Sequence, residues 1–108
     1  MDIGDIVLIP FPFAELTNVK VRPAVIASIT KDTYNDIVIC AISSVIPTAL
    51  SSNEFVVESG GENSLRVSSV VKVDRIVTLK SKNVITQLGK LDNKQIQIFK
   101  SKLKLLVD

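Results

Sequence analysis

Polar side chains suited to chemistry stand where apolar segments of this 108-residue chain begin and end. Arg22 precedes the apolar segment 23–29, and Ser43 and Ser44 follow the apolar segment 37–42. If these segments are neighbouring antiparallel strands, Arg22 and Ser43 come to the same edge of the sheet. A cation beside a hydroxyl group suits a phosphate, because the arginine fork donates two parallel hydrogen bonds and stays charged at any working pH.

An ordinary structural role competes with this interpretation. Arg22 can pair with Asp5 or Glu15, and the two serines can satisfy backbone groups of the loop that follows them. The spacing of the residues leaves both interpretations open.

The composition excludes several kinds of catalytic site. The chain has no His, which excludes Ser-His-Asp and Cys-His nucleophile systems, a histidine base and histidine metal ligands. Its single cysteine, Cys40, excludes an intrachain disulfide and a multi-cysteine metal site. Because Cys40 lies in the apolar run IVICAI, we expect a buried thiol in a reducing compartment. Any enzyme must work with carboxylates, Arg, Lys, hydroxyl groups and the backbone.

Charge is distributed unevenly although the net charge is only +2. Residues 1–65 hold 3 basic and 8 acidic groups, a sum of −5, whereas residues 66–108 hold 10 basic and 3 acidic groups, a sum of +7. This asymmetry suits either a cationic surface for phosphates and acidic partners or a solvated lysine-rich terminus. No apolar run approaches the roughly 18 residues of a membrane span, and the first residues are acidic, so we expect a cytoplasmic protein.

The apolar residues favour strands over helices. The chain has 15 Val and 13 Ile against 10 Leu and 5 Ala, and β-branched side chains suit pleated sheets. Apolar runs and period-two alternation predict one domain over residues 1–108, a small, mainly β barrel in which Pro10 ends the first strand. Strands are expected over residues 6–9, 23–29, 37–42, 54–57, 65–74 and 76–79.

An amphipathic helix is expected at the end of the chain. Asp92 and Gln95 have the spacing of a capping box, in which each side chain satisfies a backbone N–H of the other residue. Ile98 and Leu105 project to a different side from the main apolar stripe and are candidates for contact with a neighbouring chain. The stripe itself comprises Ile96, Phe99, Leu103 and Leu106.

Five segments resemble, in order, those of the MazF/PemK family of toxin endoribonucleases from prokaryotic toxin-antitoxin systems. They are GDIVLIPFPF, KVRPAVIAS, IVICAISS, SVVKVDRIVTL and ITQLGKL, and together they extend over nearly the whole chain. The resemblance implies a small SH3-like β-barrel with a C-terminal helix, usually a homodimer, that cuts single-stranded RNA at short preferred sequences with no metal or cofactor. It also implies a cognate antitoxin that occupies the RNA groove with an extended segment.

The resemblance also implies roles for individual residues. The family's catalytic arginine corresponds to Arg22 in VRPA, and its hydroxyl residue, commonly Thr, corresponds to Ser43 in AISS. Serine keeps the donor but lacks the methyl group that restricts the threonine rotamer. Residues 16–19, LTNV, stand where many relatives carry a glycine and a serine. The expected RNA contacts are Glu15, Asn18 and Lys20 of the first loop, which closes over the substrate in the family, together with Ser44.

RNA cleavage of this type suits the composition. The 2′-hydroxyl of RNA is itself the nucleophile, so the enzyme must align it, stabilise charge on the phosphoryl oxygens and assist proton transfer. The expected products are a 2′,3′-cyclic phosphate and a 5′-hydroxyl. Arg22 is the expected charge stabiliser, since a pKa above about 12 makes arginine a poor proton shuttle, and Glu15 is the candidate proton acceptor.

Two other functions compete with the nuclease. One is a catalytically silent relative that binds RNA or an antitoxin, suggested by the altered first loop and by Ser43. The other is a toxin of the same fold that acts by contact with a protein target such as a topoisomerase, in which case the C-terminal helix and not Arg22 would carry the activity.

Overall fold

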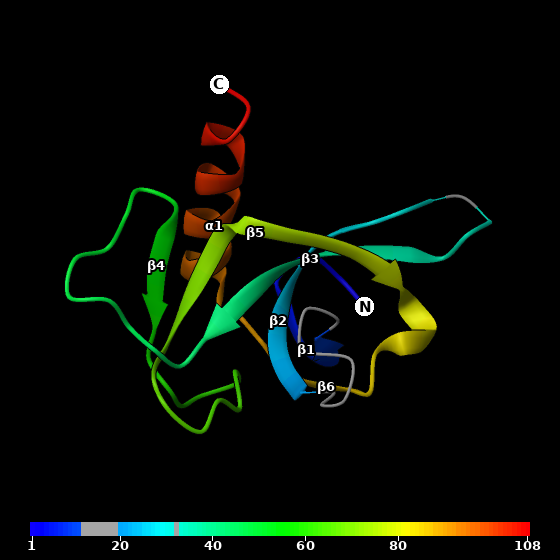
Figure 1. Ribbon diagram of the computed structural model, residues 1–108, viewed down its shortest axis with the longest axis horizontal. Coiled ribbons are helices and arrows are strands. Elements are labelled where there is room, and N and C mark those ends of the chain that lie inside the picture. The colour runs from blue at the N-terminus through cyan, green and yellow to red at the C-terminus, as the bar shows by residue number, and fades with distance from the viewer. Residues whose placement is uncertain (12–19, 32) are drawn as a thin grey trace.

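The computed structural model describes residues 1–11, 20–31 and 33–108 and shows a six-stranded antiparallel sheet with one C-terminal α-helix (Figure 1). The sheet curls into a half-barrel, which confirms the expected mainly β fold with a terminal helix. The strands lie in the order β4-β5-β3-β2-β1-β6, so β4 and β6 form the two edges. The elements are β1 (Asp5–Phe11), β2 (Lys20–Ile29), β3 (Asp36–Ser43), β4 (Glu54–Val57), β5 (Ser69–Lys80), the short 3₁₀-helix η1 (Ser81–Asn83), β6 (Thr86–Lys90) and α1 (Asn93–Leu105).

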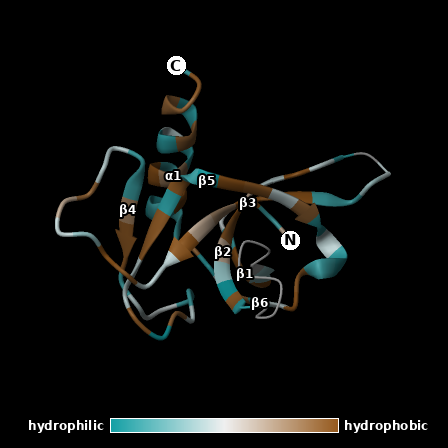
Figure 2. Cartoon of the chain, viewed as in Figure 1, coloured by the Kyte–Doolittle hydropathy of each residue, from teal (hydrophilic) through white to brown (hydrophobic). Residues whose placement is uncertain are grey.

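Alternating side chains of the strands enter two apolar cores. Along β2, Val25 belongs to the first core, whereas Ala24 and Ile26 belong to the second, as period-two alternation requires. The first core packs against α1, and hydrophobic residues run through the central strands while the helix alternates between hydrophobic and hydrophilic sides (Figure 2). The first core contains Ile6, Val25, Cys40, Ile42, Phe55, Val57, Val71, Val73, Leu91 and Phe99. The second contains Val7, Ile9, Ala24, Ile26, Ile37 and Ile39.

The C-terminal helix begins and packs as the sequence predicts. The Asp92 carboxylate accepts the Gln95 N–H at 2.7 Å, and the Gln95 side chain accepts the Asp92 N–H at 2.9 Å, which completes the capping box. Phe99 is fully buried against Phe55, with ring centroids 6.3 Å apart, and Ile96, Leu103 and Leu106 pack on the same core. Ile98 and Leu105 are exposed. None of the described helices is long and apolar enough to cross a membrane.

The first two strands extend further than predicted. Pro10 does not end β1, because it pairs with Val21 of β2 and the strand continues to Phe11. The other neighbour of β1, strand β6, pairs only with residues 5–8, so the missing N–H of Pro10 interrupts no ladder there. Strand β2 likewise begins at Lys20 and not at Pro23, which lengthens the part of the sheet that carries Arg22.

Strand β5 is one long bent strand where the sequence predicted two. Cys40 pairs with Ile76 and the next residue, Ala41, pairs with Lys72, so residues 73–75 form a bulge opposite β3. The bulge lets the first half of β5 place Val71 and Val73 in the first core while Val77 in the second half packs on the other core. Residues 65–68, predicted as strand, precede β5 without joining it, and β6 was not predicted.

A loop covers the outer edge of β6. The buried Asn63 holds the loop together, since its side chain accepts the N–H groups of Gly60 and Leu65 and donates to the carbonyl of Glu58 at 2.8 Å. The Lys90 N–H then donates to the carbonyl of Glu62 at 3.0 Å. A Cβ atom at Gly89 would collide with this carbonyl, so the loop can lie on β6 only where the side chain is absent.

Candidate functional site

Arg22 and Ser43 lie at the same end of two neighbouring strands. Strands β2 and β3 are antiparallel, and Ala24 pairs with Ala41. This pair ends the ladder between the two strands. Arg22 lies two residues before Ala24 and Ser43 lies two residues after Ala41, so strand alternation places both side chains on the face of the two alanines. The predicted juxtaposition of the two residues therefore follows from the observed strand pairing.

Arg22 carries a charge that no described acid neutralises. Its side chain is partly buried at the end of the second core, next to Ile9 in the β1–β2 pairing. Among residues 1–11, 20–31 and 33–108, no side chain forms an ion pair or hydrogen bond with the Arg22 guanidinium. The alternative partner Asp5 instead accepts the N–H of Asp2 at 2.8 Å. The pairing of Arg22 with Asp5 is therefore wrong, whereas Glu15, the other proposed partner of Arg22, lies outside the described residues.

The Ser43 hydroxyl has one of its hydrogen-bonding positions occupied. Its Oγ accepts the N–H of Val45 at 3.1 Å, so the serine does satisfy the loop backbone, as the structural interpretation predicted. This contact holds the oxygen in place but leaves the O–H available as a donor. Ser43 can therefore accept the Val45 N–H and donate its own O–H to another group at the same time.

Of the other predicted site residues, two lie in the part of the chain that the structure describes and two lie outside it. Lys20 is exposed at the start of β2, two residues before Arg22, so strand alternation places it on the same face. Ser44 is exposed in the bend directly after Ser43. Glu15 and Asn18 lie outside the described residues.

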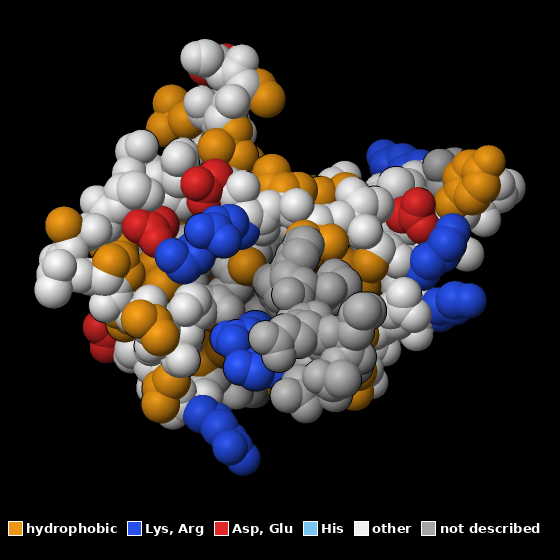
Figure 3. Space-filling model, viewed as in Figure 1, with side chains coloured by type: hydrophobic (Ala, Val, Ile, Leu, Met, Phe, Trp, Pro, Cys, Tyr) orange, Lys and Arg blue, Asp and Glu red, His pale blue; other side chains and the backbone are white. Residues whose placement is uncertain are grey.

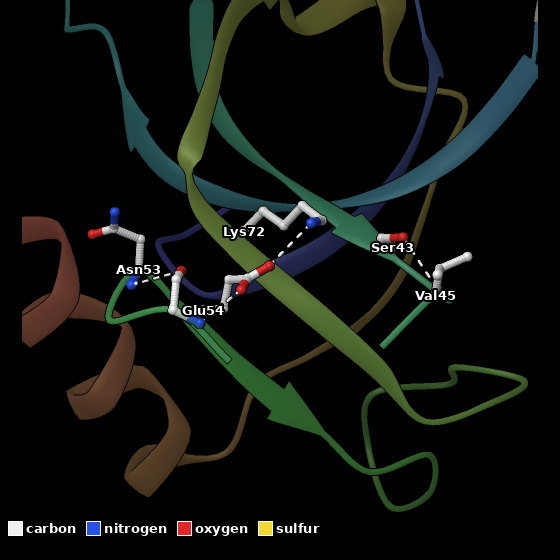
Figure 4. A network of polar contacts seen from close by, with 6 residues as sticks. Ser43, Val45, Asn53, Glu54 and Lys72 are labelled. Carbon is white, nitrogen blue, oxygen red and sulfur yellow. Dashed lines mark hydrogen bonds and ion pairs between the residues drawn. The ribbon is translucent and has the colours of Figure 1, made fainter. Parts of the chain in front are cut away.

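The structure adds an ion pair that the sequence did not predict. Lys72 of β5 pairs with Ala41 of β3 on one side and Glu54 of β4 on the other, so its side chain shares the face of Arg22 and Ser43. The Lys72 Nζ lies 3.0 Å from Glu54 Oε2. Figure 4 shows the Lys72 side chain on the side of β5 that leads to the end of β3. In Figure 3, basic side chains gather near the centre of this view, some directly beside acidic ones.

Glu54 is held from a second direction by the turn before β4. Its Oε1 accepts the N–H of Ser51 at 2.9 Å. This backbone hydrogen bond, followed by the hydrogen bond from Lys72, lowers the pKa of the Glu54 carboxyl below its ordinary value, because both contacts favour the charged form. The sequence signal for the pair was a lysine between Val71 and Val73 in an apolar strand, but its partner depended on the β4–β5 register.

Cys40 takes no part in this site. It is fully buried in the first core, as expected, and its Sγ donates to the carbonyl of Val73 at 3.4 Å. Burial, with a smaller contribution from Asp74, raises the pKa of the thiol to about 12, so the thiolate is disfavoured at neutral pH. Within the described ranges, no three His, Cys, Asp or Glu side chains gather closely enough to hold a metal ion.

A comparison with protein families assigns the chain to a known group. Residues 2–107 match the model of the PemK-like, MazF-like toxins of type II toxin-antitoxin systems. The chain belongs to this family. The match extends over nearly all of the sequence and confirms the resemblance on which the site residues were chosen. No curated protein matches the sequence.

Solved structures of MazF toxins share the fold. MazF from Deinococcus radiodurans is 24% identical, with a TM-score of 0.71, and the match covers 99% of this chain and 96% of that one. The Deinococcus MazE–MazF complex is similar at 24% identity and a TM-score of 0.71, covering 99% of this chain and 95% of that one. A mycobacterial endoribonuclease in complex with its cognate antitoxin has 16% identity and a TM-score of 0.72, covering 96% and 91% of the two chains.

Proposed function

We propose that this chain is the toxin of a type II toxin-antitoxin system and a metal-independent endoribonuclease that cuts single-stranded RNA at preferred sequences. The 2′-hydroxyl attacks the adjacent phosphorus, the bond to the 5′-oxygen breaks, and a 2′,3′-cyclic phosphate and a 5′-hydroxyl result. The observation that carries the proposal is Arg22, which has no acidic partner among the described residues and lies at the same end of the β2–β3 pair as Ser43. Family membership supports the same activity.

Arg22 supplies the charge stabilisation in this mechanism. As the attack proceeds, negative charge increases on the non-bridging oxygens, and a fixed guanidinium stabilises it without reorganisation of solvent. The side chain is partly buried beside the apolar Ile9, which restricts its motion and excludes part of the water. Such a position strengthens electrostatic interactions compared with a fully exposed arginine.

Ser43 assists as a hydrogen-bond donor. Its Oγ accepts the Val45 N–H, which leaves the O–H free to donate to another group. The O–H donates to a second phosphoryl oxygen. The Val45 contact also supplies some of the rotamer restriction that the methyl group of a threonine would give.

The proton acceptor is proposed from the remaining carboxylates. Glu54 shares the face with Arg22, but its lowered pKa makes it a weak base at neutral pH. Glu15, in the first loop, is therefore the proposed acceptor. Asn18, Lys20 at the start of β2 and Ser44 are proposed as RNA contacts.

Incubation with single-stranded RNA in the presence of EDTA tests the activity. We expect cleavage that leaves 2′,3′-cyclic phosphate and 5′-hydroxyl ends, which sequencing of the ends identifies. RNA binding without cleavage would instead support the catalytically silent alternative. Toxicity that survives loss of Arg22 but not changes in α1 would support a protein target.

The substitution Arg22→Ala tests the role of the arginine. We expect cleavage to fall by about 10²-fold or more, the usual loss for one transition-state donor. The matched control is Arg75→Ala, which removes an exposed arginine from the bulge of β5. Equal cleavage by wild type and a folded Arg22→Ala protein contradicts the assignment.

We also infer a cognate antitoxin and a homodimer as partners. The family is defined by toxin-antitoxin systems, and two structural neighbours were solved with an antitoxin or with MazE. An acidic antitoxin segment that binds near Arg22 competes with RNA, so titration of the antitoxin should inhibit cleavage. Ile98 and Leu105, 37% and 60% exposed on α1, are candidates for the contact between protomers. Sedimentation of the wild type and of Ile98→Lys tests this contact.

A further inference from the structure

The Lys72–Glu54 pair lies one strand beyond the proposed catalytic residues. In the register of β3 and β5, Ser43 pairs with Val70, and Lys72 is two residues further along β5 on the same face. Such diagonal neighbours have Cα atoms about 7–8 Å apart. Figure 4 shows Ser43 and the Lys72–Glu54 pair in this arrangement. A nucleotide adjoining the phosphate at Arg22 and Ser43 therefore lies within reach of the pair.

Lys72 and Arg22 differ in whether an acidic side chain lies beside the positive charge. Arg22 has no acidic partner among the described residues, whereas Lys72 donates to Glu54 at 3.0 Å. A second phosphate at Lys72 would approach the Glu54 carboxylate and be repelled by it. A neutral group that offers both an acceptor and a donor matches the pair instead.

The pair retains hydrogen-bonding capacity in a fixed geometry. One of the three N–H bonds of Lys72 serves Glu54, and each Glu54 oxygen accepts one bond, from Ser51 or from Lys72. The side chains are 28% and 11% exposed, so they are accessible yet partly shielded from water. Fixed, partly desolvated donors and acceptors discriminate most strongly between ligands.

We propose that Lys72 and Glu54 bind the edge of one nucleobase next to the scissile phosphate and thereby contribute to the sequence preference of cleavage. The matching edge has a carbonyl oxygen beside a ring N–H, as guanine and uracil have. Lys72 donates to the carbonyl, and Glu54 accepts from the ring N–H. This inference rests on the proposed RNA-cleaving function and adds a specificity determinant to it.

Selection of bound sequences from a random 2′-O-methyl RNA pool tests the inference without cleavage. These RNAs lack the attacking hydroxyl, so wild-type protein with Arg22 intact can be used. The proteins compared are wild type, Lys72→Met, Lys72→Arg, Glu54→Gln and Lys80→Met. Lys80→Met is the matched control, because Lys80 forms a cross-strand pair with Asp36 at the far end of the same strand.

We expect wild type and the control to prefer guanine or uracil at one position of the bound RNA. Lys72→Met should reduce that preference by roughly 5-fold or more and leave other positions unchanged. Lys72→Arg, which keeps the charge and the donors, should retain a preference there. Glu54→Gln leaves Lys72 without a counter-charge, so it should change the preferred base and steepen the salt dependence by about 0.7, the contribution of one added phosphate contact.

Several results would overturn the inference. A uniform loss of affinity in Lys72→Met across all sequences, with a shallower salt dependence, would make Lys72 a phosphate contact. An unchanged preference in a folded Lys72→Met protein would remove the pair from recognition. If wild type binds no RNA at all, both this inference and the proposed function fail. If it binds with the expected preference but does not cut unmodified RNA, only the nuclease function fails.

Discussion

The two halves of β5 carry similar ion pairs in different surroundings. In the first half, Lys72 lies 3.0 Å from Glu54, and the two side chains are 28% and 11% exposed. In the second half, Lys80 lies 3.4 Å from Asp36, with exposures of 51% and 26%. Both pairs join residues directly opposite each other on antiparallel strands. The two pairs share this cross-strand arrangement, but only the contact between Lys72 and Glu54 is also a hydrogen bond.

What distinguishes the pairs is what lies next to them. Lys72 shares a face with Arg22 and Ser43, whereas Lys80 lies 5.4 Å from the centre of the Tyr34 ring beside the β2–β3 connection. The Lys80–Asp36 pair therefore contributes to the pairing of the end of β5 with the start of β3, as exposed cross-strand pairs commonly do. The role that a cross-strand ion pair can have thus depends on the residues around it. The bulge at residues 73–75 separates the surroundings of Lys72 from those of Lys80.

The two halves of β5 should differ most in how much a substitution in the core beside each half lowers the free energy of unfolding. Phe99 of α1 is fully buried in the core that the first half of β5 covers, so Phe99→Ala should cost about 3–5 kcal/mol of the free energy of unfolding. Leu79→Ala, in the half-exposed second half, should cost below about 2 kcal/mol. Denaturant unfolding followed by circular dichroism measures both. Equal losses would show that the two cores contribute alike.

A smaller effect should appear at acidic pH, where the stabilising contribution of Glu54 is lost. Because the folded pKa of Glu54 is below its ordinary value of 4.5, Glu54 contributes stability above that pH and loses it as pH falls through the lowered value. The melting temperature of the wild type should therefore approach that of Glu54→Gln between about pH 5 and pH 2. Lys72→Met should keep part of the dependence, since the Ser51 N–H contact remains. Parallel melting curves for wild type and Glu54→Gln over this range count against the Ser51 and Lys72 contacts.

The smallest expected effect concerns Cys40, which pairs with Ile76 where the two halves of β5 meet. With a pKa of about 12 and no exposed surface, its thiol should stay unmodified by iodoacetamide at about pH 8 in the folded protein. Modification should become rapid only in denaturant. Mass spectrometry of the two samples reads the outcome, and fast labelling of folded protein would indicate that the bulge opens.

Local patterns predicted most elements of this fold. The alternation of Val and Ile identified the strands, and Asp92 with Gln95 marked the start of α1, because these signals are set by neighbouring residues. The prediction that Arg22 and Ser43 lie at the same end of the sheet needed only the antiparallel pairing of the consecutive strands β2 and β3. The extension of β1 through Pro10 could not be predicted, because it depends on how far β6 reaches along the other side.

The Lys72–Glu54 pair could not be predicted from the sequence. Eighteen positions separate the two residues, and their contact depends on the register between β4 and β5. The two strands are joined by a loop in which Asn63 satisfies three backbone groups. No periodicity in the sequence reports such a loop. The predicted contacts Glu15 and Asn18 lie outside the described residues and stay predictions.

The loop over β6 has a consequence for the behaviour of the protein in solution. An edge strand presents unpaired backbone groups to which a strand of another molecule can add. The Glu62 carbonyl occupies one of these groups on β6, the Lys90 N–H, and it can approach only because Gly89 has no side chain. The loop that lies against Gly89 therefore covers this part of the β6 edge and hinders the addition of a foreign strand there.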